Sequence, residues 1–379
     1  MRTLPNVVGR GPLRATVRAM LASHRSLPLA SLAFVAACAQ AQTPTPVAAS
    51  SPPTATAAPP PPPPSAAPAA GDPRFDAELT AYEYPFAVHY LELSSQRQQL
   101  KMAYMDVAPA QPNGHTVVLL HGKNFTGAYW ATTIRFLTER GYRVIAPDQI
   151  GFGKSSKPAA YQYSFQQLAD NTRAVLDAAG VAKVSVVGHS MGGMLATRFA
   201  LMHADRVEKL ILVNPIGLED WKTVVPYHPV DQWYEQEKKA TAESVREYQR
   251  TSYYGGTWKP EYEKLIEFSV GMTRHPDYPK VAWASALLYD MIYSQPVVYE
   301  FPRLKVPTLL VIGQRDRTAL GRAWAPKELA ATLGDYPALG KRAAAAIPGA
   351  KLVELPGVGH VPQVEAFEAY AQALAQFLP

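Results

Sequence analysis

Residues 187–193 read Val-Gly-His-Ser-Met-Gly-Gly and stand between a short apolar run, Val184–Gly188, and a segment with helical periodicity, Met191–His203. The stretch fits the pattern Gly-x-Ser-x-Gly, a tight strand-to-helix turn that holds a serine on a strained backbone. A Cβ atom on either glycine of this pattern should collide with the neighbouring strand or helix. The turn exposes the hydroxyl of Ser190 and directs a helix N-terminus at developing negative charge. We therefore interpret Ser190 as a nucleophile.

Strand and helix patterns alternate on both sides of this turn. The first two expected strands alternate in the manner of an antiparallel hairpin, and the later ones are short apolar runs typical of buried parallel strands. The pattern predicts an α/β fold with a mostly parallel eight-stranded sheet and helices on both faces. The expected strands are Phe86–Leu93, Leu100–Val107, Thr116–Leu120, Tyr142–Pro147, Val184–Gly188, Lys209–Asn214, Thr308–Ile312 and Lys351–Leu355. The expected helices include Ser164–Ala179, Met191–His203 and about Val364–Phe377.

The alternation breaks between residues 215 and 302, where aromatic and charged residues mix at helical spacing. An insertion of this size between two core strands predicts a helical cap. The expected organisation of the chain is a signal peptide at 1–38, a Pro/Ala-rich disordered linker at 39–75, a core at 76–214 and 303–379, and the cap at 215–302.

The composition fits one large α/β domain. The 47% hydrophobic and 18% charged residues are ordinary for a globular protein, and many of the 35 prolines lie between residues 44 and 73, where no core can be buried. The formal net charge of +6 owes much to arginines before residue 26. We expect the mature domain to be nearer neutrality and predict no nucleic-acid partner.

The N-terminus is typical of an export signal. Arg25 precedes the apolar run Leu27–Ala37, which is too short to span a membrane and ends in small residues. Met20 is an alternative start, because residues 20–40 alone have the proportions of a signal peptide.

Cys38, the single cysteine of the sequence, follows Val35-Ala36-Ala37. This resembles the lipobox of bacterial lipoproteins, in which the thiol is acylated after cleavage. We expect an exported protein that is periplasmic or anchored in the outer membrane through lipidated Cys38, and a plain secretory signal is the alternative. The folded domain then has no cysteine for a disulfide or a thiolate site.

A serine nucleophile needs a base, and the base needs a carboxylate that fixes its tautomer. In this kind of fold the acid and then the histidine follow the serine along the chain. The sequence Gly357-Val358-Gly359-His360 comes just after the expected strand Lys351–Leu355, so His360 is the expected general base. His189, beside the nucleophile, should point away from it and pack. The remaining histidines fit less well, because they lie before the sheet core, at a helix end or in the expected cap.

The expected acid is Asp316, four residues after the strand Thr308–Ile312 and between the serine and the histidine in sequence. The competing position is the end of the preceding strand, where Asn214 is uncharged. More distant alternatives are Glu219, Asp220 and Asp290.

The tetrahedral oxyanion of acyl transfer needs two N–H donors. We expect the backbone of Met191 to give one, and the loop after residues 119–122 to give the other through the amide of Lys123, with Asn124 second. The Asn124 side chain has two open interpretations: it binds substrate, or it caps a helix that starts near Ala128. The sequence has no glycine-rich phosphate loop and no His/carboxylate cluster with metal-ligand spacing, so we predict no cofactor and no metal.

Together these motifs resemble the α/β-hydrolase superfamily, in its serine-nucleophile branch with a helical cap, near carboxylesterases and carbon–carbon bond hydrolases. The motifs are His121-Gly122, Asp148-Gln149-Ile150-Gly151-Phe152-Gly153-Lys154-Ser155, the turn at 187–193, the Asp316 loop and Gly359-His360. The resemblance extends from about residue 86 to the C-terminus. It implies a structural role for Asp148–Ser155. Relatives that open epoxides or displace halide use an aspartate nucleophile, so Ser190 implies acyl transfer.

We expect a serine hydrolase that cleaves carboxylic esters through an acyl-enzyme on Ser190. The alternatives are a carbon–carbon bond hydrolase, aminopeptidase, lactonase or perhydrolase with the same residues, and a non-catalytic surface protein. Aromatic cap residues bury apolar groups well, so the expected partner is an ester with a hydrophobic acyl or aryl group. Residues 318–347 exceed what the fold needs, and whether they border the pocket stays open. The aromatic candidates for pocket walls are Trp221, Tyr227, Trp233, Tyr234, Tyr248, Tyr253, Tyr254, Trp258, Tyr262, Tyr289 and Tyr293.

Overall fold

The computed structural model describes residues 74–379. The expected signal peptide, Cys38 and all but the last two residues of the expected linker lie outside this range. The last residue of that linker, Phe75, is buried and packs against Phe268 and Met272. The folded part of the chain therefore includes Phe75.

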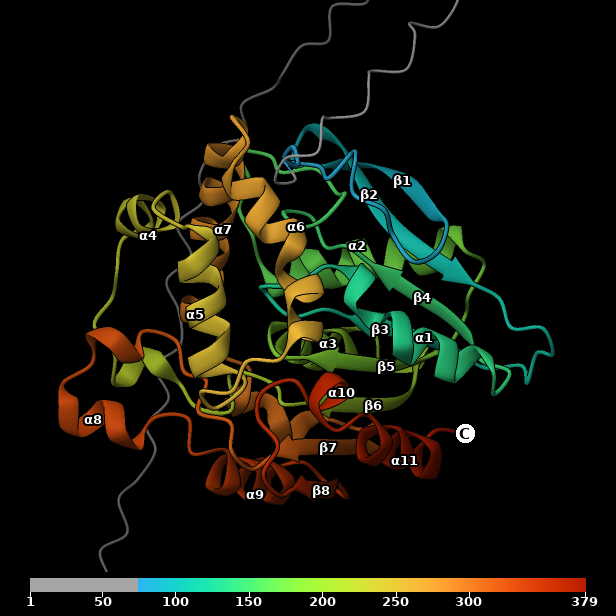
Figure 1. The fold of residues 1–379 in the computed structure, drawn as a ribbon. Helices are drawn as coiled ribbons and strands as arrows, with labels where there is room; N and C mark the ends of the chain where they lie inside the picture. The colour runs from blue at the N-terminus through green and yellow to red at the C-terminus, as the bar shows by residue number, and fades with distance from the viewer. Residues whose placement is uncertain (1–73) are drawn as a thin grey trace, which may run out of the picture. The chain divides into compact units, whose positions relative to one another are not determined.

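Eight strands form one sheet in the order β1-β2-β4-β3-β5-β6-β7-β8 (Figure 1). β2 pairs antiparallel with β1 and with β4, and every other pair is parallel. The predicted fold class is thus confirmed. The strands are β1 (Val88–Ser95), β2 (Gln98–Val107), β3 (Thr116–Leu120), β4 (Arg143–Pro147), β5 (Val184–His189), β6 (Val207–Val213), β7 (Thr308–Gly313) and β8 (Lys351–Leu355).

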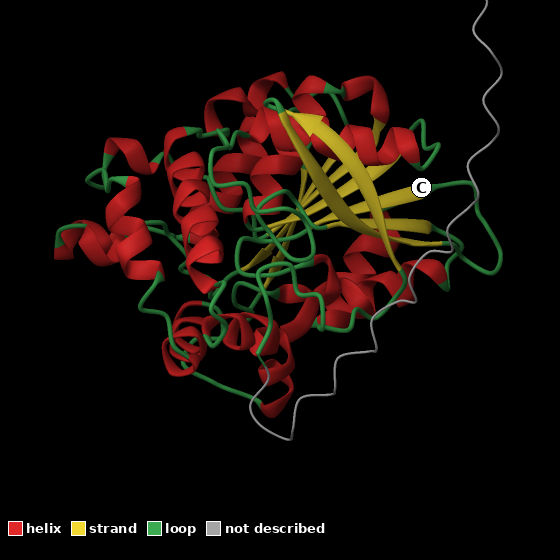
Figure 2. Cartoon of the chain, turned by 90° about the horizontal axis from the view of Figure 1, so that it is seen from above, coloured by secondary structure: helices red, strands yellow, loops and turns green. Residues whose placement is uncertain are grey.

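Helices cover both faces of this twisted sheet (Figure 2). Because successive side chains of a strand point to opposite faces, Val118 and Leu120 of β3 join one core cluster while Val117 and Leu119 join another. The first cluster packs under α2 (Phe165–Ala178), α3 (Met191–Met202) and α9 (Tyr336–Ala346). The second packs under α1 (Ala131–Thr138) and α11 (Phe367–Phe377).

The chain between β6 and β7 forms further helices, which stand over one end of the sheet (Figure 1). They are α4 (Val230–Glu237), α5 (Ala242–Ser252), α6 (Glu263–Thr273) and α7 (Tyr278–Ser294). We call residues 230–294 the cap helices. The domain limits predicted at 215 and 302 stay a prediction. Within residues 74–379, no helix has the length and apolar character needed to cross a membrane.

Most predicted elements differ from the structure by one or two residues at an end, and two differences have a clear local cause. The hairpin turn is tighter than expected: β1 runs on to Ser95 and β2 already starts at Gln98, because Gln96 and Arg97 form a two-residue turn with φ of 49° and 62°. At its other end β1 starts at Val88 and not at Phe86. The expected helix Val364–Phe377 is interrupted at Ala366, where φ is −142°. Its first turn, α10 (Pro362–Glu365), belongs to the loop before it, since the Glu365 carboxylate accepts a hydrogen bond from the Gly359 amide at 2.9 Å.

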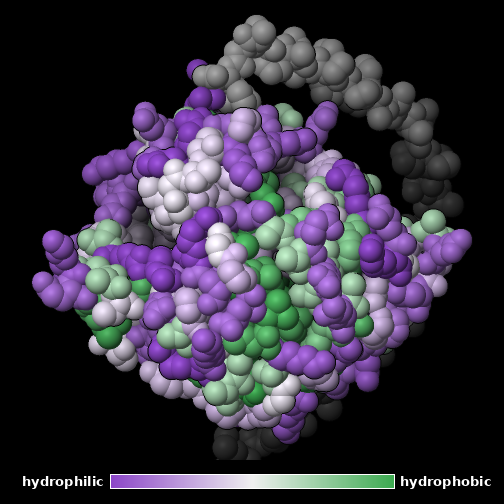
Figure 3. Space-filling model, turned by 60° about the horizontal axis from the view of Figure 1, so that its bottom comes forward, coloured by the Kyte–Doolittle hydropathy of each residue, from purple (hydrophilic) through white to green (hydrophobic). Residues whose placement is uncertain are grey.

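One outer face carries a continuous group of hydrophobic residues surrounded by hydrophilic ones (Figure 3). That view brings the bottom of Figure 1, where β8 and α9 lie, toward the reader. β8 is the edge strand of the sheet, and its exposed residues Lys351 and Glu354 are charged. Charged side chains on an edge strand oppose pairing with another sheet.

Candidate active site

Ser190 occupies the turn between β5 and α3. Its backbone has φ 57° and ψ −122°, a conformation that L-residues rarely adopt. A Cβ atom on Gly188 would lie 2.2 Å from the carbonyl oxygen of Gly192, and one on Gly192 would lie 2.2 Å from that of Leu120. The predicted need for glycine at both positions is confirmed, because any side chain there would push the helix off the sheet.

The structure brings Ser190, His360 and Asp316 together, as the sequence predicted. His360 Nε2 lies 3.0 Å from Ser190 Oγ, and His360 Nδ1 lies 2.6 Å from Asp316 Oδ2. The exposed fractions are 5% for Ser190, 1% for Asp316 and 0% for His360. A buried carboxylate at Nδ1 keeps the proton on that nitrogen and leaves Nε2 free to accept the serine proton.

Asn214 supports Asp316 in a way that the sequence did not suggest. Its Nδ2 donates to Asp316 Oδ2 at 2.8 Å, and its Oδ1 accepts from the amide of Gly313 at 2.8 Å. The amide of Thr318 donates to the other carboxylate oxygen at 2.8 Å. The competing acid position thus holds a side chain that orients the acid. The sequence held one indication of this role: an asparagine, Asn214, stands at the position where some relatives have their acid.

The base is held partly by the chain that follows α5. The amide of His360 donates to the carbonyl oxygen of Tyr253 at 3.0 Å, and the two rings stack with centroids 4.5 Å apart. Burial raises the pKa of Tyr253 well above 10, so its hydroxyl stays protonated. Sequence reasoning missed this contact, because a single tyrosine in an aromatic-rich insertion carries no local signal.

His189 packs under the site, as predicted, and its hydrogen bonds define its tautomer. Burial lowers its pKa well below 6.5, so the ring is neutral. Nε2 contacts the carbonyl oxygen of His360 at 2.8 Å and must be the donor, which leaves Nδ1 to accept from the Tyr129 hydroxyl at 3.0 Å. His189 therefore ties the backbone of His360 to Tyr129.

The two predicted oxyanion donors lie beside the nucleophile. Met191 is the first residue of α3, and the first N–H groups of a helix have no acceptor within the helix. Lys123 follows Gly122, where a Cβ atom would lie 3.1 Å from the Cβ of Ser190. Within residues 74–379 the backbone amides of Lys123 and Met191 have no hydrogen-bond acceptor. Both amides are therefore available to an oxyanion.

The Lys123 and Asn124 side chains reach toward the cap helices. Lys123 Nζ donates to Ser285 Oγ at 2.7 Å and lies 3.4 Å from the ring centroid of Tyr289. Burial lowers the Lys123 pKa to about 8. Asn124 Nδ2 donates to the Tyr253 hydroxyl at 2.8 Å. Of the two interpretations left open for Asn124, helix capping is wrong, because Thr126 is the cap and its side chain accepts from the Ala128 amide.

A cavity of about 40 Å³ lies over Ser190. It is far smaller than a typical ligand pocket, so substrate entry requires side chains around it to move. Residues 318–320 border it, which answers the question left open for residues 318–347. Four of the aromatic candidates line it, and others pack among themselves, as Tyr254 does on Tyr262. The lining residues are Lys123, Asn124, Ser190, Ile216, Trp221, Tyr248, Tyr253, Tyr289, Ile292, Thr318, Ala319 and Leu320.

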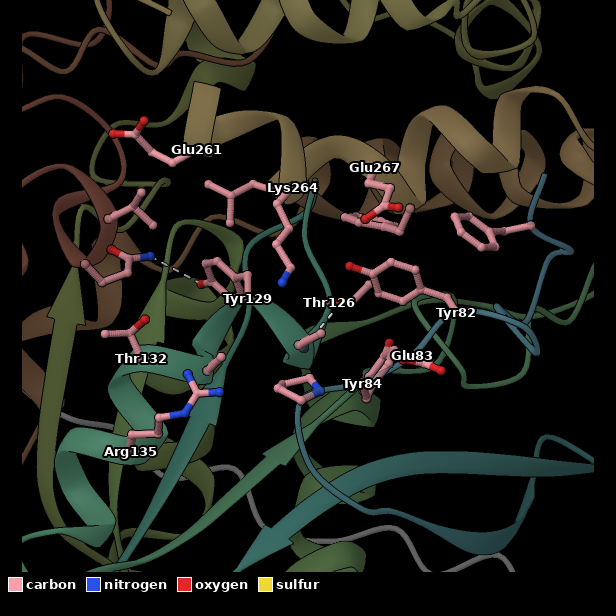
Figure 4. A pocket seen from close by; sticks show the side chains of 18 of the residues that line it. Tyr82, Glu83, Tyr84, Thr126, Tyr129, Thr132, Arg135, Glu261, Lys264 and Glu267 are labelled. Atoms are coloured by element: carbon pink, nitrogen blue, oxygen red, sulfur yellow. Dashed lines mark hydrogen bonds between the residues drawn. The ribbon is translucent and has the colours of Figure 1, made fainter. Parts of the chain in front are cut away.

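A larger cavity, of about 900 Å³, lies apart from this site between α1, α6 and residues 75–85 (Figure 4). Lys264 points into it from α6, with Tyr82 and Tyr129 on its walls. Neither Ser190, Asp316 nor His360 lines this cavity. Size alone would therefore point to the wrong place for the chemistry.

The stretch Asp148–Ser155 is structural, as the resemblance implied. The Asp148 carboxylate accepts from the Tyr84 hydroxyl at 2.6 Å, from the Gly127 amide at 2.6 Å and from the Lys154 amide at 2.8 Å. These bonds join the segment before β1 to the loops after β3 and β4. None of them involves the nucleophile or the base.

The chain belongs to the alpha/beta hydrolase fold family, whose model matches residues 115–367. It also resembles the crystal structure of a probable hydrolytic enzyme from Pseudomonas aeruginosa. The two are 55% identical, with a TM-score of 0.80 over 81% of this chain and 99% of that one. These similarities identify the protein as a hydrolase of this fold.

Curated relatives carry out more than one kind of reaction. A haloalkane dehalogenase from Mycobacterium marinum is 28% identical over 64% of this chain and 82% of its own length. A 2-hydroxymuconate semialdehyde hydrolase from Pseudomonas putida is 35% identical over 32% of this chain and 44% of its own length. Most of the first curated relatives are matched over less than two thirds of their length. The relatives therefore do not determine which type of bond this protein cleaves.

Proposed function

We propose that the protein is a serine hydrolase that cleaves carboxylic esters through an acyl-enzyme on Ser190. The observation that carries the proposal is the contact of His360 with both Ser190 Oγ, at 3.0 Å, and Asp316 Oδ2, at 2.6 Å. A hydroxyl nucleophile with a histidine base suits attack on an acyl carbon. The dehalogenase relatives do not lead us to halide displacement, because the nucleophile here is a serine.

The reaction follows from the positions of the protons. His360 Nε2 takes the proton of Ser190 as Oγ bonds to the carbonyl carbon, and the amides of Lys123 and Met191 bind the oxyanion. The carbon–oxygen bond to the alcohol then breaks, and His360 returns the proton to the departing alcohol. Water, deprotonated by His360, next attacks the acyl-enzyme and releases the acid, and the proton returns to Ser190. No group beyond these residues and water is needed to balance the steps.

Covalent labelling tests the nucleophile. A fluorophosphonate should label the wild-type protein and fail to label Ser190→Ala, with unfolding measured to show that the variant is folded. Equal labelling of both proteins would reject Ser190 as the nucleophile. Absence of labelling in the folded wild type would favour the alternative of a non-catalytic surface protein.

A series of p-nitrophenyl esters tests the bond. We expect turnover of short acyl chains, and the chain length at which turnover declines measures how far the side chains around the cavity of about 40 Å³ move. No turnover of any ester would reject the proposal. The second candidate is a carbon–carbon bond hydrolase, which the Pseudomonas putida relative favours. Its test is loss of the absorbance of 2-hydroxymuconate semialdehyde, and turnover of that compound without ester turnover would replace the first proposal.

We also propose that the protein is exported and tethered to a membrane through lipidated Cys38. The support is the sequence Val35-Ala36-Ala37-Cys38 after an apolar run. Growth of the expressing bacterium with a radioactive fatty acid should label the mature protein, and Cys38→Ser should not be labelled. An unlabelled wild-type protein at the end of that experiment would leave the secretory signal as the better interpretation.

A further inference from the structure

Lys123 is the one Lys, Arg, Asp or Glu side chain among the described residues that line the cavity over Ser190. Its side chain is 9% exposed, and the nearest carboxylate oxygen, Glu237 Oε2, lies 4.0 Å from Nζ. Burying a charge is costly unless it is paired and hydrogen-bonded. An anionic ligand that bound this ammonium group beside the nucleophile would offset the free-energy cost of its desolvation.

The hydrogen bonds of this lysine leave room for such a ligand. An ammonium group has three N–H donors. One reaches Ser285 Oγ, whose own proton goes to Glu237, and the face of the Tyr289 ring lies against the group. Thr318, on the cavity wall, has a buried hydroxyl without a hydrogen-bond partner in residues 74–379. An N–H group of Lys123 and the hydroxyl of Thr318 can therefore still donate to a ligand beside Ser190.

We propose that Lys123 and Thr318 bind a carboxylate of the substrate, so that the enzyme prefers esters that carry an acid group near the scissile carbonyl. This inference rests on the proposed ester hydrolysis. The amide of Lys123 is the proposed oxyanion donor and its ammonium ends a four-carbon stem, so the acid group binds one lysine side-chain length away from that donor. A hydrogen-bonded ion pair in a dry site should favour the acidic ester roughly 10- to 100-fold in kcat/KM.

Two pairs of esters test the proposal. One pair carries the acid on the acyl side of the scissile ester bond, and the other carries it on the alcohol side. The first pair is p-nitrophenyl hemiglutarate and its neutral isostere, p-nitrophenyl 5-methylhexanoate. The second is the butyrate ester of 3-hydroxybenzoate and that of 3-isopropylphenol. Spontaneous hydrolysis is subtracted in each case. A preference for the acid in either pair supports the proposal, and preference for the neutral member in both pairs overturns it.

Variants assign the preference to the residue. Lys123→Met keeps the backbone amide and should lower the ratio of kcat/KM for acidic over neutral ester roughly 10-fold or more. The ratio is the readout, because this residue also contributes an oxyanion donor. Thr318→Val should lower the same ratio less. The matched control is Lys239→Met, two residues beyond Glu237 and exposed, which removes one positive charge and should leave the ratio unchanged.

The preference should depend on pH. Burial lowers the Lys123 pKa to about 8 while Glu237 opposes the shift, so the acid-over-neutral ratio should fall as the pH rises through about 8. The pKa values of Tyr248, Tyr253 and Tyr289 are raised above 10, so these hydroxyls stay neutral there. Glu237→Gln should move the fall to lower pH.

The outcomes separate this inference from the proposed function. Turnover of neutral esters without a preference for acidic ones rejects the carboxylate site and leaves the esterase standing. No turnover of any ester and no fluorophosphonate label rejects both. A structural role for Lys123, as a link between the core and the cap helices, would change the free energy of unfolding in Lys123→Met but leave the ratio and its pH dependence unaltered.

Discussion

The sheet and the cap helices differ in how many of their residues they bury. Every residue of β5 and β7 is buried, whereas α5 buries Gln249 alone among its eleven residues. The sheet carries Ser190 and Asp316 on loops at the ends of these strands, and the cap helices contribute aromatic walls and the partners of Lys123. Chemistry thus depends on the part of the molecule with little freedom to move. We expect the side chains of the cap helices that wall the cavity to be the ones that move when substrate enters.

The largest effect should come from the core, at the acid. Asp316→Asn keeps the size of the side chain but allows the wrong tautomer of His360, so turnover should fall by roughly 10⁴-fold. The free energy of unfolding should change little by comparison. The check is kcat for a p-nitrophenyl ester together with a urea unfolding curve. Near-wild-type turnover would return the choice of acid to Glu219, Asp220 or Asp290.

A pair of glycine substitutions compares the two regions directly. In Gly192→Ala the new Cβ would lie 2.2 Å from the Leu120 carbonyl oxygen, which the sheet holds in place, so unfolding should become easier by about 3 kcal/mol or more. Gly256, after α5, has φ 88° but no atom nearer than 3.7 Å to a new Cβ. Gly256→Ala should therefore cost about 1 kcal/mol. Equal losses in urea unfolding would mean that the cap helices pack as tightly as the sheet.

The same contrast explains what could be predicted from the sequence. β3 and β8 were placed to the residue, because short apolar runs between turns have one solution in a buried parallel sheet. Ser190, Asp316 and His360 could be found, since each follows a strand that ends at the same edge. The contacts of Asn214 with Asp316 and of Tyr253 with His360 could not, because they join segments far apart in sequence. Their side chains carry no pattern before the chain folds.

Lys123 reaches from the core to the cap helices, and its effect should appear in the pH dependence of stability. Its pKa falls from 10.5 to about 8 on folding, so between these values the unfolded chain binds more protons than the folded one. Stability therefore rises with pH in that window. Relative to Lys123→Met, the wild type should gain roughly 2 kcal/mol in unfolding free energy between pH 7 and pH 10. A pH-independent difference between the two urea curves would show that the lysine titrates normally.

The smallest effect should lie within the cap helices, at the ion pair between Arg246 of α5 and Glu263 of α6. Arg246 Nε lies 2.6 Å from Glu263 Oε1 and Nη2 lies 3.0 Å from Oε2, but the side chains are 38% and 46% exposed. Water and salt screen such a pair, so its coupling should be below about 1 kcal/mol. A double-mutant cycle with Arg246→Met and Glu263→Gln measures it.

A matched cycle on Arg198 and Glu300 supplies the comparison for the core. That pair joins α3 to the segment before β7, and its side chains are 12% and 26% exposed. Because it is less screened, its coupling should exceed that of the cap pair and should change less between low and high salt. The opposite result would be a cap pair with the larger coupling energy and the smaller dependence on salt. It would mean that ion pairs stabilise the cap helices as much as packing stabilises the core, and the contrast drawn between the two regions would be wrong.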